Sequence, residues 1–345
     1  MQQKPTCIGT GLLALDAVIN TDINIYPQLY AGGSCGNVLS ILAFLGWNAL
    51  PVARLADNKA SRILECDLKH WDVDTRFIEH TSTGSTPIII HRILKDEQGK
   101  PKHKFEFKDP DNGNWLPQYK PILAKNVGNL TSALPQPSVF YFDRATRASI
   151  ELAKFYKNQN SLIFFEPSSN SDLQLFEEAL GIAHIVKFSS DRIKNYQRTY
   201  HYSNALLEIE TLGTQGLRYR MNSVTATEWV SLPSFHISAV MDAAGAGDWT
   251  TAGFINYLFQ SSNALLVEEL FDAPIDKYLS DAQALGALNC CYPGARGLMY
   301  SLTLEELTTQ VSLIQEGDFI SNALAHPVSK SVSNIFTEKL SSLYN

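Results

Sequence analysis

Basic clusters, C-x-x-C cysteine spacings and long apolar runs are all missing from this chain of 345 residues. Its 28 lysines and arginines are outnumbered by 35 aspartates and glutamates, and no basic tract or basic-aromatic stripe occurs. Nucleic-acid-binding proteins usually carry such a basic patch, so nucleic acid is excluded as the main partner. No apolar run approaches the roughly 20 residues that cross a membrane, and the first residues lack an apolar signal-peptide core. We therefore expect a cytoplasmic protein without a membrane partner.

The cysteines form no framework. There are five of them, an odd number, and none is spaced as C-x-x-C: Cys7, Cys35, Cys66, Cys290 and Cys291. Such a set is typical of reduced thiols and not of a disulfide scaffold or a zinc site. The histidines show no i, i+4 pairs or grouping with carboxylates, so a transition-metal site is not expected either.

The order of the predicted elements indicates an α/β fold. Buried strands are expected at residues 6–11, 49–55, 138–142, 162–165, 184–188 and 206–211, mostly with helical patterns between them. Strands that alternate with helices build a mostly parallel, doubly wound sheet. Ligands of such a sheet bind at the carboxyl ends of its strands. No linker separates a second independent domain.

A β-rich stretch at residues 81–108 interrupts this alternation. Residues 86–94 and 102–108 read as the two strands of a hairpin, in which Phe105 and Phe107 face one side and charged residues the other. A sheet with one apolar face is expected to bury that face, and a partner subunit is one way to do so.

A glycine-rich segment stands at the centre of the functional argument. Residues 236–240 are predicted as a strand, residues 250–259 have a helical apolar pattern, and Gly245, Ala246 and Gly247 open that helix. The first N–H groups of a helix lack partners and favour anions, and the carboxylate of Asp248 follows directly. This pattern suits phosphoryl transfer, in which amides hold the phosphoryl oxygens and a carboxylate takes a proton. It is equally typical of tight helix–strand packing in which Asp248 only caps the helix.

Three elements, in the same order, resemble the ribokinase-like (PfkB) carbohydrate kinase family. Residues 242–248, Asp-Ala-Ala-Gly-Ala-Gly-Asp, are similar to its Asp-Thr-x-Gly-Ala-Gly-Asp signature. Residues 32–37, Gly-Gly-Ser-Cys-Gly-Asn, resemble its N-terminal glycine pair and following asparagine, and residues 211–216 resemble its Thr-x-Gly-x-x-Gly turn. The resemblance covers most of the chain.

The resemblance implies a three-layer α/β/α fold with a mostly parallel sheet of roughly nine strands and a small β-sheet lid. Residues 1–12, 31–80 and 109–345 would form the nucleotide- and substrate-binding α/β domain, and residues 13–30 and 81–108 the β lid. In the family this lid covers the substrate and often mediates dimerisation, so a homodimer through the lid is an expectation here.

The resemblance also implies roles for individual residues. Asp248 would be the general base, and the backbone N–H groups of Gly245, Ala246 and Gly247 would form the anion hole. Contacts to substrate hydroxyls are expected from Asp16, Gly32, Gly33 and Asn37. Contacts to the nucleotide are expected from Thr211, Gly213, Gly216 and Asn289. Two of these have a plainer alternative: Asp16 as a strand-end carboxylate and Asn37 as a helix cap.

Two family patterns are altered in this chain. The Asp-x-Asn-x-Arg that follows a central strand is replaced by a segment starting with Glu166, and the Asn-x-x-Glu that organises magnesium is replaced by residues 189–192, Ser-Ser-Asp-Arg. Asp191 is the one candidate for the magnesium role, because Mg²⁺ requires oxygen ligands, and Arg192 could neutralise phosphate charge. The signature threonine is also replaced, by Ala243. These changes suggest weaker magnesium handling, a different donor or lost catalysis.

The sequence therefore predicts ATP-dependent phosphorylation of a hydroxymethyl group on a sugar or sugar-like metabolite. ATP and Mg²⁺ are the expected cofactors, and a monovalent cation is left open. The alternatives are a nucleoside kinase of the same fold and a catalytically impaired binding or regulatory protein. A Rossmann dehydrogenase is disfavoured, because no G-x-G-x-x-G follows the first strand.

Overall fold

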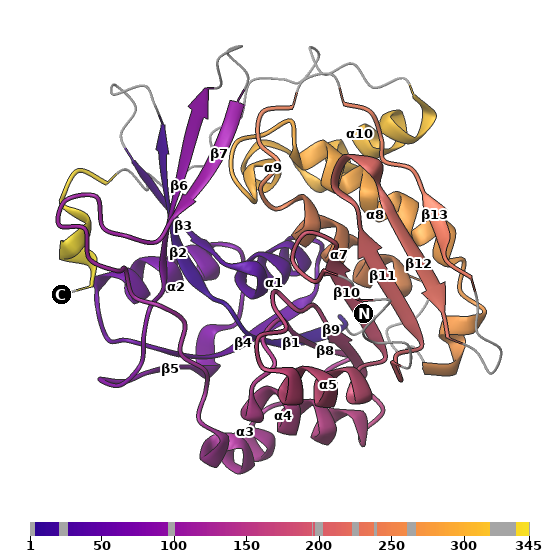
Figure 1. Cartoon of the computed structure of the whole chain (residues 1–345), viewed down its shortest axis with the longest axis horizontal. Helices are drawn as coiled ribbons and strands as arrows, with labels where there is room; N and C mark the ends of the chain where they lie inside the picture. The colour runs from indigo at the N-terminus through magenta and orange to yellow at the C-terminus, as the bar shows by residue number, and fades with distance from the viewer. Residues whose placement is uncertain are drawn as a thin grey trace.

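The computed structural model describes residues 4–20, 27–95, 101–194, 196, 203–222, 228–237, 240–260, 267–317 and 336–344. In these ranges a large sheet of nine strands forms the centre of the molecule, and a smaller sheet stands at one side of it (Figure 1). The order across the large sheet is β13-β12-β11-β10-β9-β8-β1-β4-β5. Its strands are β1 (Thr6–Thr10), β4 (Asn48–Leu55), β5 (Ile78–His80), β8 (Val139–Phe142), β9 (Leu162–Phe165), β10 (Ile185–Ser189), β11 (Leu207–Thr211), β12 (Leu217–Met221) and β13 (Val230–Leu232).

The large sheet is parallel from β5 to β11; at its other edge β12 pairs antiparallel with β11, and β13 pairs antiparallel with β12. The strand order changes direction at β1, because β4 lies on one side of β1 and the later strand β8 on the other. In open α/β sheets the ligand crevice lies at the carboxyl ends of the strands beside such a switch point. The fold thus places a site at the ends of β1 and β8.

Helices cover both faces of the large sheet (Figure 1). They are α1 (Ser34–Phe44), α2 (Lys59–His70), α3 (Val127–Ala133), α4 (Arg147–Lys157), α5 (Leu173–Ile182), α7 (Ala246–Leu258), α8 (Ile275–Asn289), α9 (Gly297–Ser301) and α10 (Leu304–Glu316). Short 3₁₀ turns lie at η1 (Thr75–Phe77), η2 (Ala124–Asn126), η3 (Gly213–Gln215), η4 (Val267–Phe271) and η6 (Leu340–Leu343).

Two hydrophobic cores follow from the alternation of side chains along the strands. Cys7 and Tyr141 face a core shared with α1, α7 and α8, whereas their neighbours Ile8 and Phe140 face a second core shared with α4 and α5. The alternation of strands and helices predicted a doubly wound sheet, and the three-layer fold confirms it.

The small sheet has four strands among the described residues, in the order β3-β2-β6-β7. They are β2 (Ala14–Asn20), β3 (Gln28–Gly32), β6 (Ile88–Lys95) and β7 (Pro101–Glu106). Leu15, Leu29 and Ile88 bury one face in the same core as Leu64 and Leu68 of α2. The expected hairpin at residues 86–108 is present as β6 and β7. That this sheet acts as a separate lid domain stays a prediction.

β3 ends at Gly32 and α1 begins at Ser34, because Gly33 turns the chain at once with a φ of 78°. One local prediction, the strand at residues 236–240, was wrong for the residues of it that the structure describes. His236, Ile237 and Val240 lie outside any strand, and β13 ends earlier, at Leu232. The amide of Met241 instead donates to the carbonyl of Cys290 at the end of α8, so this segment is fixed by a helix end and not by a sheet.

None of the helices in the described part of the chain is both long enough and apolar enough to cross a membrane.

Candidate active site

Helix α7 begins at the glycine-rich segment, as the sequence predicted. Gly245 is its N-cap and has a left-handed φ of 76°. A Cβ atom at this position would lie 2.0 Å from the carbonyl oxygen of Ala295, so the loop after α8 can approach only a glycine here. The start of α7 is thereby held against that loop.

The carboxylate of Asp242 shapes the turn that precedes α7. It accepts hydrogen bonds from the amide of Ala244 at 2.7 Å and from the amide of Gly294 at 2.8 Å. The N–H of Ala244 is therefore engaged within the protein, and it is the amides from Gly245 onward that stand at the open helix start. The amide of Ala246 makes only a long contact of 3.4 Å, to the carbonyl of Ala243.

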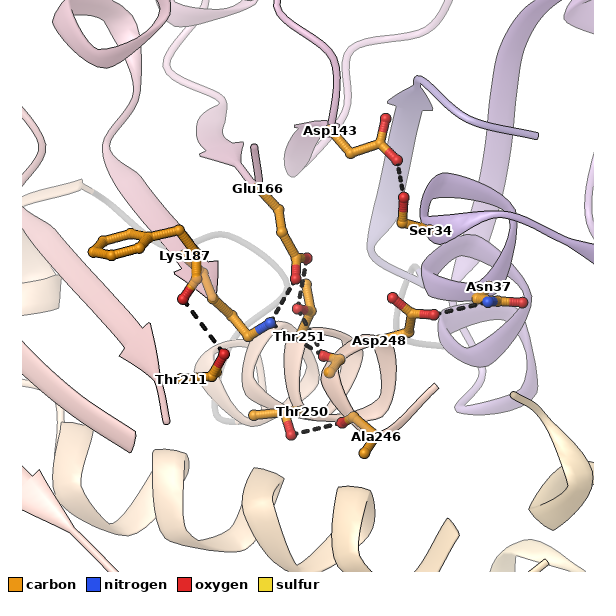
Figure 2. Close-up of polar contacts among 12 residues, drawn as sticks. Ser34, Asn37, Asp143, Glu166, Lys187, Thr211, Ala246, Asp248, Thr250 and Thr251 are labelled. Carbon is orange, nitrogen blue, oxygen red and sulfur yellow. Dashed lines mark hydrogen bonds and ion pairs between the residues drawn. The ribbon is translucent and has the colours of Figure 1, made fainter. Parts of the chain in front are cut away.

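Asp248 lies in the first turn of α7 and its carboxylate points toward α1 (Figure 2). The amide nitrogen of Asn37 donates to its Oδ2 at 2.7 Å, so two residues that are far apart in sequence are in direct contact. Burial raises the pKa of Asp248 to about 7, and the negative charge of Glu166 adds to the rise. The hydrogen bond from Asn37 and the positive charges of Lys187 and Arg192 act in the opposite direction. A carboxylate with such a pKa is suited to accept a proton near neutral pH.

A buried ion pair lies beside this turn of α7 (Figure 2). Lys187 of β10 donates to Glu166 Oε1 at 2.5 Å and to the carbonyl oxygen of Gly247 at 3.2 Å. Glu166 Oε2 accepts from the hydroxyl of Thr251 at 2.7 Å and from that of Tyr141 at 3.1 Å. The side chains of Lys187 and Glu166 are 3% and 14% exposed. The pair thus connects the ends of two central strands to the helix that carries Asp248.

Asp143 occupies the switch point of the sheet, directly after β8. Its carboxylate accepts from the amide of Leu12 at 3.0 Å, from the amide of Cys35 at 3.1 Å and from the hydroxyl of Ser34. It therefore ties the end of β1 to the start of α1. Two arginines follow in the same segment and pair with carboxylates nearby: Arg144 with Asp143 at 3.3 Å and Arg147 with Glu178 at 2.9 Å.

Asp16 lies on β2 of the small sheet, against Gly32 of β3. A Cβ atom at Gly32 would fall 2.1 Å from Asp16 Oδ2, so the glycine makes room for the carboxylate. Burial raises the pKa of Asp16 to about 7; the charge of Arg296 opposes the rise and that of Asp67 increases it. The N-cap Gly33 packs tightly as well, since a Cβ there would lie 2.4 Å from the carbonyl oxygen of Leu12.

The residues predicted to bind the nucleotide lie on β11, the following turn and α8. Thr211 ends β11 and donates to the carbonyl of Phe188, and Gly213 and Gly216 bracket the exposed turn before β12. Asn289 is fully buried at the end of α8, where its amide donates to the carbonyl of Ala244 at 2.9 Å. This contact makes Asn289 a support of the glycine-rich turn, and direct binding of a nucleotide by it stays a prediction.

The side chains of the described residues do not assemble a magnesium site of their own. No three His, Cys, Asp or Glu side chains of the described ranges group as metal ligands. Asp191 is exposed, and the two oxygens of Glu166 already accept bonds from Lys187, Thr251 and Tyr141. Any Mg²⁺ would have to be held mainly by nucleotide phosphates and water.

Four residues that matter for this geometry were not selected from the sequence: Asp143, Glu166 as an ion-pair member, Lys187 and Arg296. Three of them carry a readable signal. Asp143 and Glu166 directly follow buried strands, at the edge where ligands bind. Lys187 is the one charged residue inside the apolar strand β10, and a buried lysine requires a partner. Arg296 stands in a loop, where nothing in the local sequence indicates its burial.

Comparisons with known proteins agree with this geometry. The model of the pfkB family carbohydrate kinases matches residues 10–300. An ATP-dependent ribose-1-phosphate kinase of Halopiger xanaduensis is 25% identical over 272 residues, covering 77% of this chain and 82% of that protein. "Probable fructokinase-2" of Arabidopsis thaliana is 23% identical over 289 residues, covering 76% and 82%. The crystal structure of a fructokinase with bound ATP from Xylella fastidiosa superposes with a TM-score of 0.69 at 20% identity, covering 91% of this chain and 99% of that one.

Proposed function

Because this chain belongs to the pfkB family of carbohydrate kinases, we propose that it transfers the γ-phosphoryl group of ATP to a hydroxymethyl group of a sugar or sugar-like metabolite. The observation that carries this proposal is the position of Asp248. Its carboxylate lies in the first turn of α7, is hydrogen-bonded to Asn37 and has a pKa raised to about 7. The hydrogen bond from Asn37 joins α1 to the first turn of α7, so Asp248 does more than cap its own helix.

The proposed step requires one proton acceptor and one anion hole. Ionised Asp248 takes the proton of the substrate hydroxyl while the oxygen of that hydroxyl attacks the γ-phosphorus. The bond between the γ-phosphorus and the oxygen shared with the β-phosphate breaks, and ADP leaves with the electron pair. The amides of Gly245, Ala246 and Gly247 would hold the phosphoryl oxygens, favoured by the positive end of the helix dipole.

Substrate hydroxyls would be held at the end of β1 and on β2. Asn37 faces Asp248 directly, so a hydroxyl bound there would lie beside the base. Asp16, Gly32 and Gly33 would complete this side of the site, with ionised Asp16 accepting hydrogen bonds from substrate hydroxyls. ATP would lie across the turn of Gly213 and Gly216, beyond Thr211, as the family resemblance implies.

Magnesium enters the proposal only with the nucleotide. Because the side chains of the described part of the chain supply no set of ligands, we derive no step through the metal and assign no role in it to Asp191. The requirement for a monovalent cation is part of the same test, since replacing potassium by sodium in the assay addresses it directly.

The experiment that tests the proposal measures ADP release from ATP and Mg²⁺ over a panel of sugars, sugar phosphates, sugar acids and nucleosides. The panel includes fructose and ribose 1-phosphate, the substrates that the names of two relatives suggest. Asp248→Asn keeps the shape of the side chain but removes the base, so turnover should fall by about 10²–10⁴-fold. Thr309→Val, on the exposed face of α10, is the control and should leave turnover unchanged.

Each outcome selects one alternative. Turnover of a sugar that collapses in Asp248→Asn supports the proposal and identifies the acceptor, whereas preferred turnover of a nucleoside would favour the nucleoside kinase. If nothing turns over while ATP or a sugar still binds by calorimetry, the chain is a binding protein, as the altered residues 189–192 suggested. Turnover that survives in Asp248→Asn would refute the role of the base.

A further inference from the structure

The buried lysine beside α7 is in an unusual place. The N-terminus of a helix favours negative charge, yet the ammonium of Lys187 lies 3.2 Å from the carbonyl oxygen of Gly247, in the first turn of α7. A buried ammonium is unfavourable unless it is paired and hydrogen-bonded. Glu166 supplies that pairing at 2.5 Å, and its own second oxygen is satisfied by Thr251 and Tyr141. The arrangement is therefore complete on its own and needs no ligand to neutralise it.

The ion pair of Lys187 and Glu166 contacts the residue directly before the proposed base, Asp248. Gly247 directly precedes Asp248, so Lys187 fixes the carbonyl of the residue next to the base. Thr251, one turn further along α7, is fixed by the same carboxylate, Glu166. The pair thus holds the first two turns of α7 against the ends of β9 and β10 (Figure 2).

We propose that Lys187 and Glu166 are positioning residues for phosphoryl transfer. Lys187 holds the first turn of α7 and balances the charge of Asp248, while Glu166 keeps that lysine in place. This inference rests on the proposed role of Asp248 and deepens it. It assigns a function to two residues that lie behind the anion hole and need not touch the substrate.

The charges around Asp248 predict opposite effects for the two members of the pair. Asp248 is faced by Cys35 and Asn37 from α1, Tyr141 from β8, Glu166 after β9, Lys187 from β10 and Arg192 after β10. Glu166 raises the pKa of Asp248, and Lys187 lowers it. Removing the charge of Lys187 should therefore raise the pKa of Asp248, and removing the charge of Glu166 should lower it.

The test compares Lys187→Met, Glu166→Gln and the double variant by the pH dependence of kcat/KM. The part of the acid limb that is set by Asp248 should move to higher pH in Lys187→Met and to lower pH in Glu166→Gln, each by about one unit, while the part set by Asp16 stays in place. The double variant should return close to the unsubstituted protein. Thr251→Val removes a hydrogen bond from Glu166 without changing charge, so it should leave the midpoint in place.

A second readout does not require activity. The titration of the Asp248 carboxyl carbon can be followed by ¹³C NMR of protein labelled at aspartate and assigned by the loss of one signal in Asp248→Asn. Its midpoint should move in the same opposite directions. Lys187→Arg keeps the charge and should titrate like the unsubstituted protein, which keeps the test available if Lys187→Met does not fold.

The outcomes separate this inference from the proposed function. Midpoints that stay fixed, or that move the same way in both single variants, would overturn the role of the pair even if Asp248→Asn abolishes turnover. If instead Asp248→Asn retains turnover while the NMR midpoints move in opposite directions, the electrostatic coupling stands and the proposed function fails.

Discussion

Two carboxylates of this protein hold protons far more tightly than ordinary aspartates do. Burial raises the pKa of both Asp16 and Asp248 to about 7. The two residues lie on different elements, Asp16 on β2 and Asp248 on α7, and have different neighbours. Ionised groups that lose water without a full set of partners take up protons instead. Perturbed groups of this kind gather at functional sites, which agrees with the roles proposed for both residues.

The pH profile of kcat/KM tests this property. Protonated Asp248 cannot accept the hydroxyl proton, and protonated Asp16 loses the charge that strengthens its hydrogen bond to a substrate hydroxyl, so activity should be lost as pH falls below about 7. If both must be ionised, log kcat/KM should rise with a slope of two on the acid side. Asp16→Asn should reduce that slope to one and raise KM more than it lowers kcat.

The control for the pH profile is Asp272→Asn, which removes an exposed carboxylate outside the site and should leave the profile unchanged. An acid limb with its midpoint near 4, the ordinary range of aspartate, would contradict the argument, because neither buried carboxylate would then limit activity.

At the scale of elements, the loop of residues 294–297 joins the parts of the site. The amide of Gly294 donates to Asp242, and the carbonyl of Ala295 packs on Gly245. The next residue, Arg296, donates to the carbonyl of Ala31 and to Asp67 Oδ2 at 2.6 Å. One loop therefore links the glycine-rich turn before α7 with β3 of the small sheet and with α2.

The ion pair of Arg296 and Asp67 should contribute strongly to the stability of this junction. Both side chains are only 3% exposed, and Asp67 also accepts from the hydroxyl of Tyr300 at 2.9 Å. Arg296→Met leaves a buried carboxylate without its cation, which typically costs about 3–5 kcal/mol of unfolding free energy. We expect a clearly lower urea midpoint for this variant.

An exposed ion pair between α2 and the segment of residues 336–344 provides the matched control. Lys59 and Glu338 are 2.8 Å apart, with side chains 45% and 54% exposed, and such pairs contribute at most about 1 kcal/mol. Lys59→Met should therefore leave the urea midpoint nearly unchanged. Equal losses in the two variants would show that burial does not set the contribution of the pair at Arg296.

The contrast between these elements also explains what the sequence could predict. The parallel sheet, the hairpin of the small sheet and the start of α7 followed from apolar runs, alternation and glycine placement, which are local patterns. The part of the small sheet at residues 13–30 was expected only from the family resemblance. The segment at residues 236–240 has a strand-like pattern, but the chain after it is anchored to Cys290, and no local pattern reports that contact. Lys187 is 21 residues from Glu166 and Arg296 is 229 residues from Asp67, so here too only the folded chain brings the partners together.

In the molecule as a whole, the small sheet lies at one side of the large sheet, and exposed aromatic residues lie on it and beside it. Phe105 and Phe107 are 52% and 50% exposed, and Trp115, which pairs with Lys108 of the same segment, is 63% exposed. The other face of the sheet is already buried in the core with α2. Exposed aromatic groups that are close together commonly mark an interface, so these three residues support the expected homodimer through the lid.

Sedimentation velocity of charge-introducing variants tests this interface. The unsubstituted protein should sediment as a dimer, and Phe107→Glu together with Trp115→Glu should shift it to a monomer, because an interface core tolerates few buried unpaired charges. Leu173→Glu changes a comparably exposed apolar residue, 55% exposed on α5 at the opposite end of the molecule (Figure 1), and should remain a dimer. A monomeric unsubstituted protein, or dissociation by Leu173→Glu alone, would place any partner elsewhere. Because the same sheet carries Asp16, dissociation should also raise KM for the acceptor if the dimer holds this sheet over the substrate.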